Sequence, residues 1–217
     1  MIVGLKMINH FTYNHFGVNC YIIVDDETKQ CAIVDPAAEA SYEEAQMFQY
    51  ISSSSLRVTH ILITHAHVDH IAGLRQCCEH FKLPVSMHAD GRKLLRQAEA
   101  YGSIMGFMVE NMNDLQVTEI HDGDTFKIGE KQVQCLFVPG HCPGSICYVI
   151  PSEKSVITGD TLFQGSIGRT DLPGGNHQEL LANLREKVMT LPDDYRVLPG
   201  HGESSTIADE KKYNPFL

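Results

Sequence analysis

Thr64-His-Ala-His-Val-Asp-His70, THAHVDH in one-letter code, directly follows a nearly continuous apolar run. His65 and His67 stand at positions i and i+2 after a predicted buried strand, so their side chains point the same way and can share one cation. Asp69 and His70 lie past the bend and can reach a second cation. Imidazole nitrogens and carboxylate oxygens suit zinc, iron or manganese. The motif therefore predicts a metal site, with a solvated histidine-rich loop as the alternative.

Three later turns repeat one arrangement, in which a candidate ligand follows a predicted strand and is flanked by glycine. They are PGHCPGS with His141, ITGDTLF with Asp160, and LPGHGE with His201. Glycine permits the tight turns that such a site needs, and loops held by a rigid scaffold often carry function. A single histidine in such a turn is more often a surface or capping residue. Taken with THAHVDH, the three turns favour one shared metal centre.

The pattern of apolar residues predicts a meander of strands and a helix, followed by a second meander and helix. We expect strands at 2–8, 19–26, 31–36, 58–65, 84–88, 125–129, 131–139, 145–151, 155–160 and 195–200, and helices at 38–51, 70–81, within 91–107 and at 176–191. Two sheets, each covered on its outside by helices, satisfy this order. The expected fold is therefore α/β, a four-layer αββα sandwich, with residues 1–217 as a single domain.

Charge and composition narrow the function. Lys and Arg total 17 against 27 Asp and Glu, which gives a net charge of −10 and disfavours nucleic acid and membrane partners. We find no signal sequence or spanning segment, so we expect a cytoplasmic protein. Its seven cysteines include no CxxC pair and are expected to be reduced core thiols. The sequence is compatible with a homo-oligomer.

The ligand motifs, in this order across residues 58–202, resemble those of the metallo-β-lactamase superfamily and most closely its glyoxalase II branch. The resemblance implies that His65, His67 and His141 bind one metal ion, that Asp69, His70 and His201 bind a second, and that Asp160 bridges both. It also implies two divalent metal ions. We expect zinc first, with iron or manganese as the alternatives.

Two cations that share a water make its proton acidic, with a pKa near about 7, so a metal-bridging hydroxide is present at neutral pH. Such a hydroxide can attack a thioester carbonyl, and a thiolate then leaves with little help from a general acid. Together with this chemistry, the resemblance to glyoxalase II implies hydrolysis of small-molecule S-acyl or hydroxyacyl thioesters. Asp69 and Asp160 are the expected catalytic residues because they hold the ions.

The sequence departs from glyoxalase II in two places. Only 16 residues follow His201, so we expect no C-terminal helical region of the kind that helps glyoxalase II to bind glutathione. Arg169 and Asp171 replace a Lys and a Tyr of the two-domain enzymes. Arg169 is expected to bind a substrate carboxylate, with a structural pair to Asp171 as the alternative.

Other activities and weaker candidates stay open. The string GRTD resembles the persulfide dioxygenases of this superfold, which use one iron, and this is the second hypothesis. A lactonase and a non-catalytic metal-binding module follow it. Met105, Met108 and Met112, together with Met87, are expected either in the core or in an adaptable apolar wall for substrate. Cys142, next to His141, is expected to be a core thiol.

Overall fold

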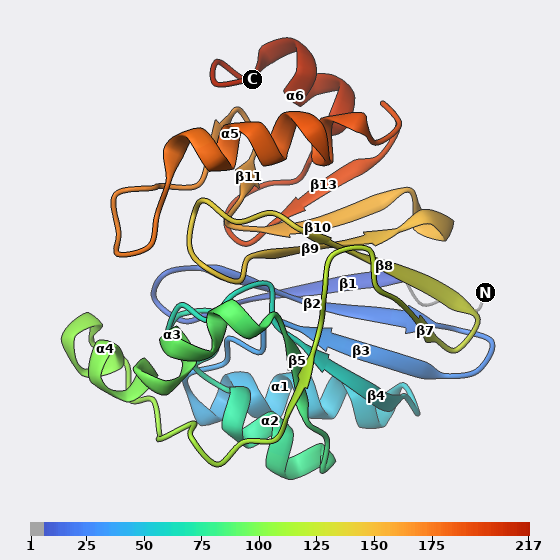
Figure 1. The fold of residues 1–217 in the computed structure, drawn as a ribbon. Helices are drawn as coiled ribbons and strands as arrows, with labels where there is room; N and C mark the ends of the chain where they lie inside the picture. Colours follow the sequence, from blue (N-terminus) through green and yellow to red (C-terminus); the bar gives the residue numbers. More distant parts are fainter. Residues whose placement is uncertain (1–6) are drawn as a thin grey trace.

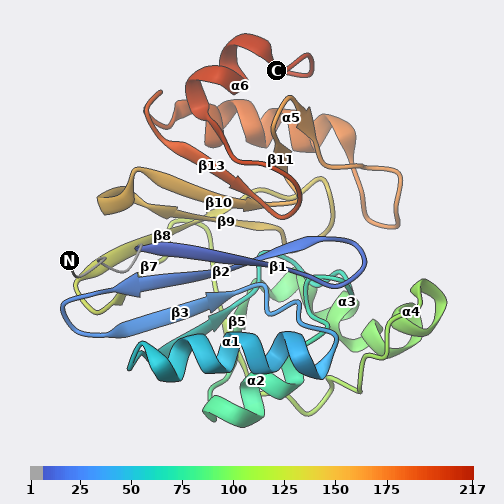
Figure 2. The ribbon, with the colours of Figure 1, turned by 180° about the vertical axis from the view of Figure 1, so that it is seen from behind.

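Two six-stranded sheets face each other in a computed structural model that describes residues 7–217. Figures 1 and 2 show helices α1 and α2 on the outer side of one sheet and helices α5 and α6 on the outer side of the other. The predicted four-layer αββα sandwich is therefore confirmed. None of the described helices combines the length and apolar character needed to cross a bilayer.

The first sheet has the order β1-β2-β3-β4-β5-β6 and the second the order β14-β13-β10-β9-β8-β7. The strands are β1 Ile8–Tyr13, β2 Val18–Asp25, β3 Gln30–Val34, β4 Arg57–Leu62, β5 Val85–Met87, β6 Val117–Glu119, β7 Thr125–Ile128, β8 Lys131–Phe137, β9 Ile146–Ile150, β10 Ser155–Gly159, β11 Leu162–Phe163, β12 Ser166–Ile167, β13 Arg196–Pro199 and β14 Ser205–Thr206. The helices are α1 Ser41–Ser53, α2 Leu74–Phe81, α3 Arg92–Arg96, α4 Ala98–Met105, α5 His177–Glu186 and α6 Ile207–Tyr213, with short 3-10 turns at Ala89–Gly91, Pro151–Glu153 and Val188–Thr190.

Strand β2 shows how the layers are built, because all of its residues are buried and alternate residues face different cores. Cys20 and Ile22 belong to the core beneath α1 and α2. Tyr21 and Ile23 belong to the core between the two sheets. A third core packs α5 and α6 against the second sheet. A strand buried on both faces is what a central strand of a four-layer sandwich requires.

Parallel pairing brings the candidate ligands to one edge. Strands β3, β4 and β5 run parallel, as do β10 and β13, and helices connect them. Parallel neighbours end at the same edge of a sheet, so the segments after β3, β4, β10 and β13 meet there. The chain leaves these four strands at Val34, Leu62, Gly159 and Pro199.

Some predicted boundaries differ from the structure or lie outside the described residues. The strand expected at 2–8 lies mostly outside the described residues, and the first described strand is Ile8–Tyr13. The helix expected from residue 70 begins only at Leu74. Before that point the backbone is used elsewhere, because His70 N–H donates to His67 O and Gly73 N–H donates to Pro36 O.

Two helical regions also differ from the prediction. The segment 91–107 forms two helices, because Gln97 leaves the helical conformation between α3 and α4. The predictions did not include β14 and α6. Thr206 accepts a hydrogen bond from Asp209 N–H and caps α6, so the T-x-x-D signal was present in the sequence.

Candidate metal centre

Three histidines from two loops bring their ring nitrogens together. His67 Nδ1 lies 3.1 Å from His65 Nε2 and 3.0 Å from His141 Nε2. His65 and His67 follow β4, and His141 follows β8. His65 and His141 are buried, as ligands of an enclosed ion would be. The structure thus assembles the trio that the sequence analysis assigned to one cation.

A second group contains Asp69, His70 and His201. His201 Nε2 lies 3.3 Å from Asp69 Oδ2, and His70 Nε2 lies 3.7 Å from the same oxygen. The ligand atoms of these three residues all lie within 4.8 Å of one another. The turn after β13 therefore reaches the bend of THAHVDH. His201 and His70 are 131 residues apart in the chain.

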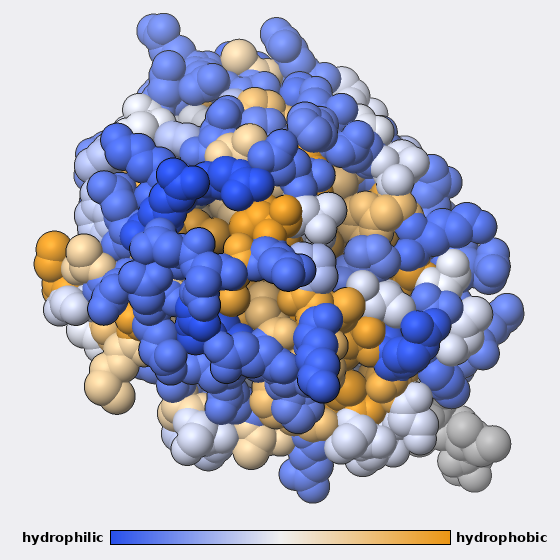
Figure 3. Space-filling view, turned by 60° about the horizontal axis from the view of Figure 1, so that its bottom comes forward, coloured by the Kyte–Doolittle hydropathy of each residue, from blue (hydrophilic) through white to orange (hydrophobic). Residues whose placement is uncertain are grey.

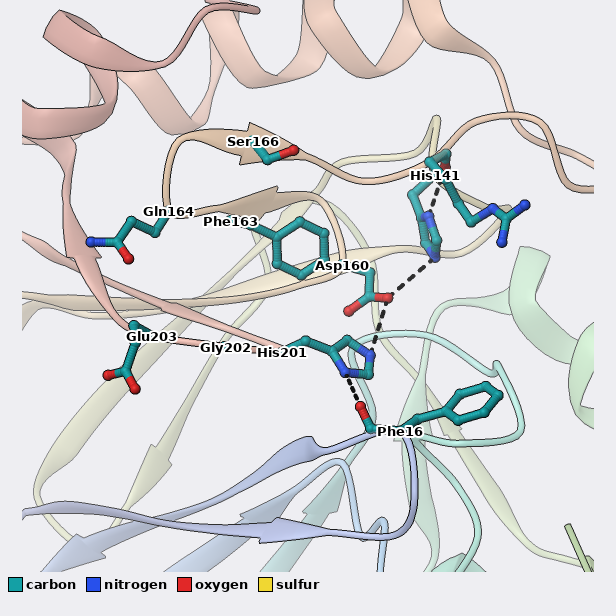
Figure 4. A pocket seen from close by; sticks show the side chains of 10 residues that line it. Phe16, His141, Asp160, Phe163, Gln164, Ser166, His201, Gly202 and Glu203 are labelled. Atoms are coloured by element: carbon teal, nitrogen blue, oxygen red, sulfur yellow. Dashed lines mark hydrogen bonds and ion pairs between the residues drawn. The ribbon is translucent and has the colours of Figure 1, made fainter.

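Asp160 lies between the two groups. Its Oδ2 is 3.8 Å from His141 Nε2 and 3.6 Å from His201 Nε2, and its Oδ1 is 3.2 Å from His70 Nε2. Figure 4 shows His141 and His201 directed at Asp160 from opposite sides. This is the position that a bridging carboxylate requires.

The donor atoms fit metal ions. Among residues 7–217, His70 Nε2 and Asp160 Oδ1 are buried and lack a hydrogen-bond partner. Buried polar atoms almost always have a hydrogen-bond partner or bind an ion. Two unpaired atoms that face each other therefore indicate a binding position between them. A cation bound by nitrogen and carboxylate oxygen would satisfy both atoms.

In four of the five histidines of the centre, Nε2 points toward the other candidate ligands and Nδ1 lies within hydrogen-bond distance of an oxygen atom. His65 Nδ1 lies 3.0 Å from Thr64 Oγ1, and His141 Nδ1 lies 2.8 Å from the main-chain oxygen of Arg169. His201 Nδ1 lies 3.0 Å from the main-chain oxygen of Phe16. Such contacts set the orientation and tautomer of a metal-binding imidazole.

The fourth of these partners is Asp35, which the sequence analysis missed. Asp35 Oδ2 lies 3.0 Å from His70 Nδ1 and accepts a hydrogen bond of 2.7 Å from Thr64 Oγ1. Its Oδ1 accepts from Thr64 N–H at 2.6 Å, and the residue is fully buried. Its position after β3, the parallel neighbour of β4, was the available signal.

The surroundings of the centre shift the pKa values of His67 and His70 in opposite directions. Burial, followed by the neighbouring His141, lowers the pKa of His67 to about 4, so this ring is neutral at pH 7 and free to bind a cation. Burial opposes the charge on His70, but Asp160, Asp69 and Asp35 outweigh it and raise its pKa. The carboxylates therefore create a place for positive charge at the second group.

Two glycines allow the loops to approach. A Cβ at Gly200 would lie 2.3 Å from Asp160 Oδ1 and 2.7 Å from His70 Cε1. A Cβ at Gly168 would lie 1.8 Å from the main-chain oxygen of Asp160. Both distances are far below van der Waals contact. Glycine is therefore needed in the turn before His201 and in the loop at Gly168, where each backbone approaches Asp160 closely.

Weaker predictions have mixed outcomes. Cys142 is a buried thiol as expected, although its sulfur lies near the ligand atoms of the histidine trio; burial raises its pKa to about 12. Met87 and Met112 are in the core, Met105 lines a cavity and Met108 is exposed. Arg169 reaches the cleft, but its guanidinium donates two hydrogen bonds of 2.8 Å to Asp171.

The candidate centre opens into a cleft with two arms. One arm is a cavity of about 700 Å³ whose lining includes Phe163, Gln164, Ser166 and Glu203. The other is a cavity of about 400 Å³ that extends toward α4. Both lie within the size range of small-molecule sites, and both include His141, Asp160 and His201.

A four-layer sandwich with histidines and aspartates gathered at one edge defines a class of metal-dependent hydrolases. The chain belongs to the metallo-β-lactamase superfamily, whose family model matches residues 13–201. It is 40% identical over 205 residues to the probable metallo-hydrolase YqgX of Bacillus subtilis, with 92% of each chain covered. It is 35% identical over 209 residues to the hydroxyacylglutathione hydrolase GloC of Haemophilus influenzae, with 93% of each covered.

Solved structures agree with this membership. The B3 metallo-β-lactamase BLEG-1 is 31% identical, with a TM-score of 0.88 and coverage of 97% of this chain and 99% of that chain. TTHA1623 in a di-iron-bound form is 32% identical, with a TM-score of 0.86 and coverage of 96% and 100%. GloC and BLEG-1 are named for different substrates, so the membership supports a metal-dependent hydrolase and does not identify its substrate.

Proposed function

We propose that this protein is a binuclear metal-dependent thioesterase that hydrolyses S-acyl or hydroxyacyl thioesters. The observation that carries the proposal is the position of Asp160 between two complete ligand groups. His65, His67 and His141 would hold the first ion, and Asp69, His70 and His201 the second. Zinc is the proposed metal, with iron or manganese as alternatives that the same donors accept.

The bound ions would supply an acidified water and a Lewis acid for the carbonyl oxygen. The chain's own residues position this chemistry. Asp160 sets the spacing between the groups, and Asn14 Nδ2 donates to the main-chain oxygen of Asp69 at 2.8 Å, which holds the turn in place. Phe16 and Phe163 border the cleft and exclude part of the solvent (Figure 4).

Similarity to GloC, which is named for hydroxyacylglutathione hydrolysis, supports a thioester substrate. A thiolate is a good leaving group, so the reaction needs no separate acid. We further propose a small-molecule substrate, a cytoplasmic location, and no role for nucleic acid or membrane. The proposal also includes assembly of the chain into a homo-oligomer.

The test combines elemental analysis of the purified protein with thioester turnover, including S-lactoylglutathione. We expect two metal ions per chain and release of free thiol. Asp69→Asn should abolish most turnover, because Asp69 contacts both His70 and His201. The matched control is His177→Ala, an exposed histidine at the start of α5.

The alternatives give different results in the same experiment. About one iron per chain and oxygen uptake with glutathione persulfide would favour the dioxygenase. Turnover of lactones but not of thioesters would favour the lactonase. Metal binding without turnover of any of these compounds would favour the non-catalytic module.

A further inference from the structure

The smaller arm of the cleft has apolar walls that the reaction chemistry does not require. The side chains that form them come from the β1–β2 turn, from α3 and α4, and from the loop before α5: Phe16, Leu94, Tyr101, Ile104, Met105 and Leu172. The same cavity is lined by His67, Asp69 and Asp160 of the candidate centre. A group held against these walls would therefore lie beside the reacting atoms.

Helix α4 presents one face to this arm. Tyr101, Ile104 and Met105 are spaced at i, i+3 and i+4, so they share a face. Gly102 lies on a different face, where an added Cβ would be 3.2 Å from the main-chain oxygen of Phe107. The following loop thus packs closely against the back of α4 and leaves the apolar face toward the cleft.

Aromatic packing holds the opposite wall. The ring of Phe16 lies 5.2 Å from the ring of Phe107, and His15 lies 4.5 Å from Phe107. Phe107 is buried, so it connects the β1–β2 turn with the loop that follows α4. The wall formed by Phe16 and the wall formed by α4 therefore both pack against Phe107.

These walls expose apolar surface to water. Ile104 is 78% exposed and Met105 is 46% exposed. Figure 3 shows apolar residues projecting at the left margin, the side where Figure 1 places α4. Single exposed apolar residues are ordinary, but apolar surface continuous with a reactive centre indicates a ligand-binding surface.

The cleft carries little positive charge for an anionic substrate. Among the described residues that line its two arms, Arg169 is the only lysine or arginine. Its guanidinium is already bound to Asp171 by two hydrogen bonds. Asp69, Asp160 and Glu203 add negative charge. Apart from bound metal ions, Arg169 is therefore the single Lys or Arg of this described lining for the two carboxylates of a glutathione conjugate, and it is already paired.

We infer that the α4 arm selects thioesters with an uncharged, apolar acyl group. This inference rests on the proposed thioesterase function and specifies its substrate class. The acyl group is assigned to this arm because the thiol leaves as an anion and is better solvated in the other arm, near Gln164 and Ser166. In the reaction the C–S bond breaks and a C–O bond forms, with water giving its hydroxyl to the acyl group and its proton to sulfur.

The test compares S-hexanoyl- and S-acetyl-N-acetylcysteamine, which share one leaving thiol, with S-lactoylglutathione. We expect kcat/KM to be on the order of tenfold or more higher for the hexanoyl compound than for the acetyl compound, because the longer chain buries more apolar surface. Met105→Ser should reduce this preference several-fold. The matched control is Met108→Ser, since Met108 is 93% exposed and does not line the arm.

A binding measurement separates recognition from turnover. The thioether S-hexyl-N-acetylcysteamine has no thioester carbonyl to attack, so calorimetry with metal-loaded and metal-free protein measures binding without turnover. We expect tighter binding than for the S-methyl compound in both forms. Met105→Ser should weaken it, whereas Met108→Ser should not.

The outcomes distinguish the two proposals. If the metal-loaded protein hydrolyses thioesters but treats hexanoyl and acetyl alike, or prefers S-lactoylglutathione, the inference about α4 is wrong and the thioesterase stands. If no thioester is hydrolysed, the proposed function itself fails. Equal effects of Met105→Ser and Met108→Ser on the preference would also overturn the assignment of this arm.

Discussion

At the scale of single residues, Asp160 is the proposed link between the two ligand groups. Its two carboxylate oxygens face His70 on one side and His141 and His201 on the other. We therefore expect Asp160→Ala to lower occupancy of both ions, whereas His201→Ala should leave about one ion per chain. Metal analysis of the two purified variants checks this. The same stoichiometry in both would remove the support for Asp160 as the bridge.

Asp35 should act on metal affinity without being a ligand. It holds His70 Nδ1 and fixes Thr64, so Asp35→Asn should weaken metal binding by about 10- to 100-fold. Competition with a chelator measures this affinity. Thr64→Ser is the control, because it keeps the hydroxyl that donates to Asp35. If the two variants bind metal equally well, Asp35 has no positioning role.

Arg169 has two roles to be separated. Its guanidinium is paired with Asp171 at an exposed position, and such pairs add little stability. We expect Arg169→Ala and Asp171→Ala to have similar small effects on thermal stability, with the double variant no worse than either single one. We also expect Arg169→Ala to leave kcat/KM unchanged on a neutral thioester.

Kinetics on an acidic thioester complete that test. If Arg169 binds a substrate carboxylate, Arg169→Ala should raise KM for the acidic compound alone, with kcat nearly unchanged. Equal losses on acidic and neutral thioesters would contradict substrate contact. Its main-chain oxygen, which contacts His141, is unaffected by either variant.

At the scale of elements, Asp25 at the end of β2 joins the two sheets. It accepts hydrogen bonds from Thr28 Oγ1 at 2.7 Å and from Glu130 N–H, in the β7–β8 turn, at 2.9 Å. Burial alone would raise the pKa of Asp25, but these hydrogen bonds lower it. The ionised form therefore stabilises the contact between the sheets.

We expect Asp25→Asn to lower the free energy of unfolding by about 1–2 kcal/mol at pH 6. Because the folded pKa lies below the unfolded value, this difference is complete above the unfolded pKa of about 3.9 and disappears as pH falls through the folded value. Denaturant unfolding at several pH values measures it. Asp26→Asn, at a partly exposed neighbour paired with Lys29, should have little effect. A difference that persists at pH 2 would show that charge is not the cause.

At the scale of the whole molecule, the candidate centre gathers loops from both sheets, so bound metal should stabilise the complete fold. Removal of metal with a chelator should lower Tm by on the order of 10 °C, and zinc should restore it, because the ions bind only the folded chain. Thermal unfolding with and without chelator checks this. Asp160→Ala should show a much smaller response. If Tm is the same with and without chelator, the centre does not bind metal in the purified protein.

Sequence alone predicted the layers, and it singled out most of the side chains that the structure brings together at the candidate centre. Short apolar runs bounded by turns predicted the strands, and the order of predicted strands and helices predicted the sandwich. His65, His67 and Asp69 were recognisable because they share one short turn. The treatment of residues 1–217 as one domain stays a prediction.

Tertiary structure decided what depends on contacts between distant segments. Asp35 acquires its role only when β3 pairs with β4, and the apolar arm exists only where α4 faces the turn that carries Phe16. The start of α2 likewise depends on a hydrogen bond from Gly73 to Pro36. Ligand types and strand periods are local properties of a sequence, whereas orienting partners, helix starts and cleft walls depend on which segments pack together.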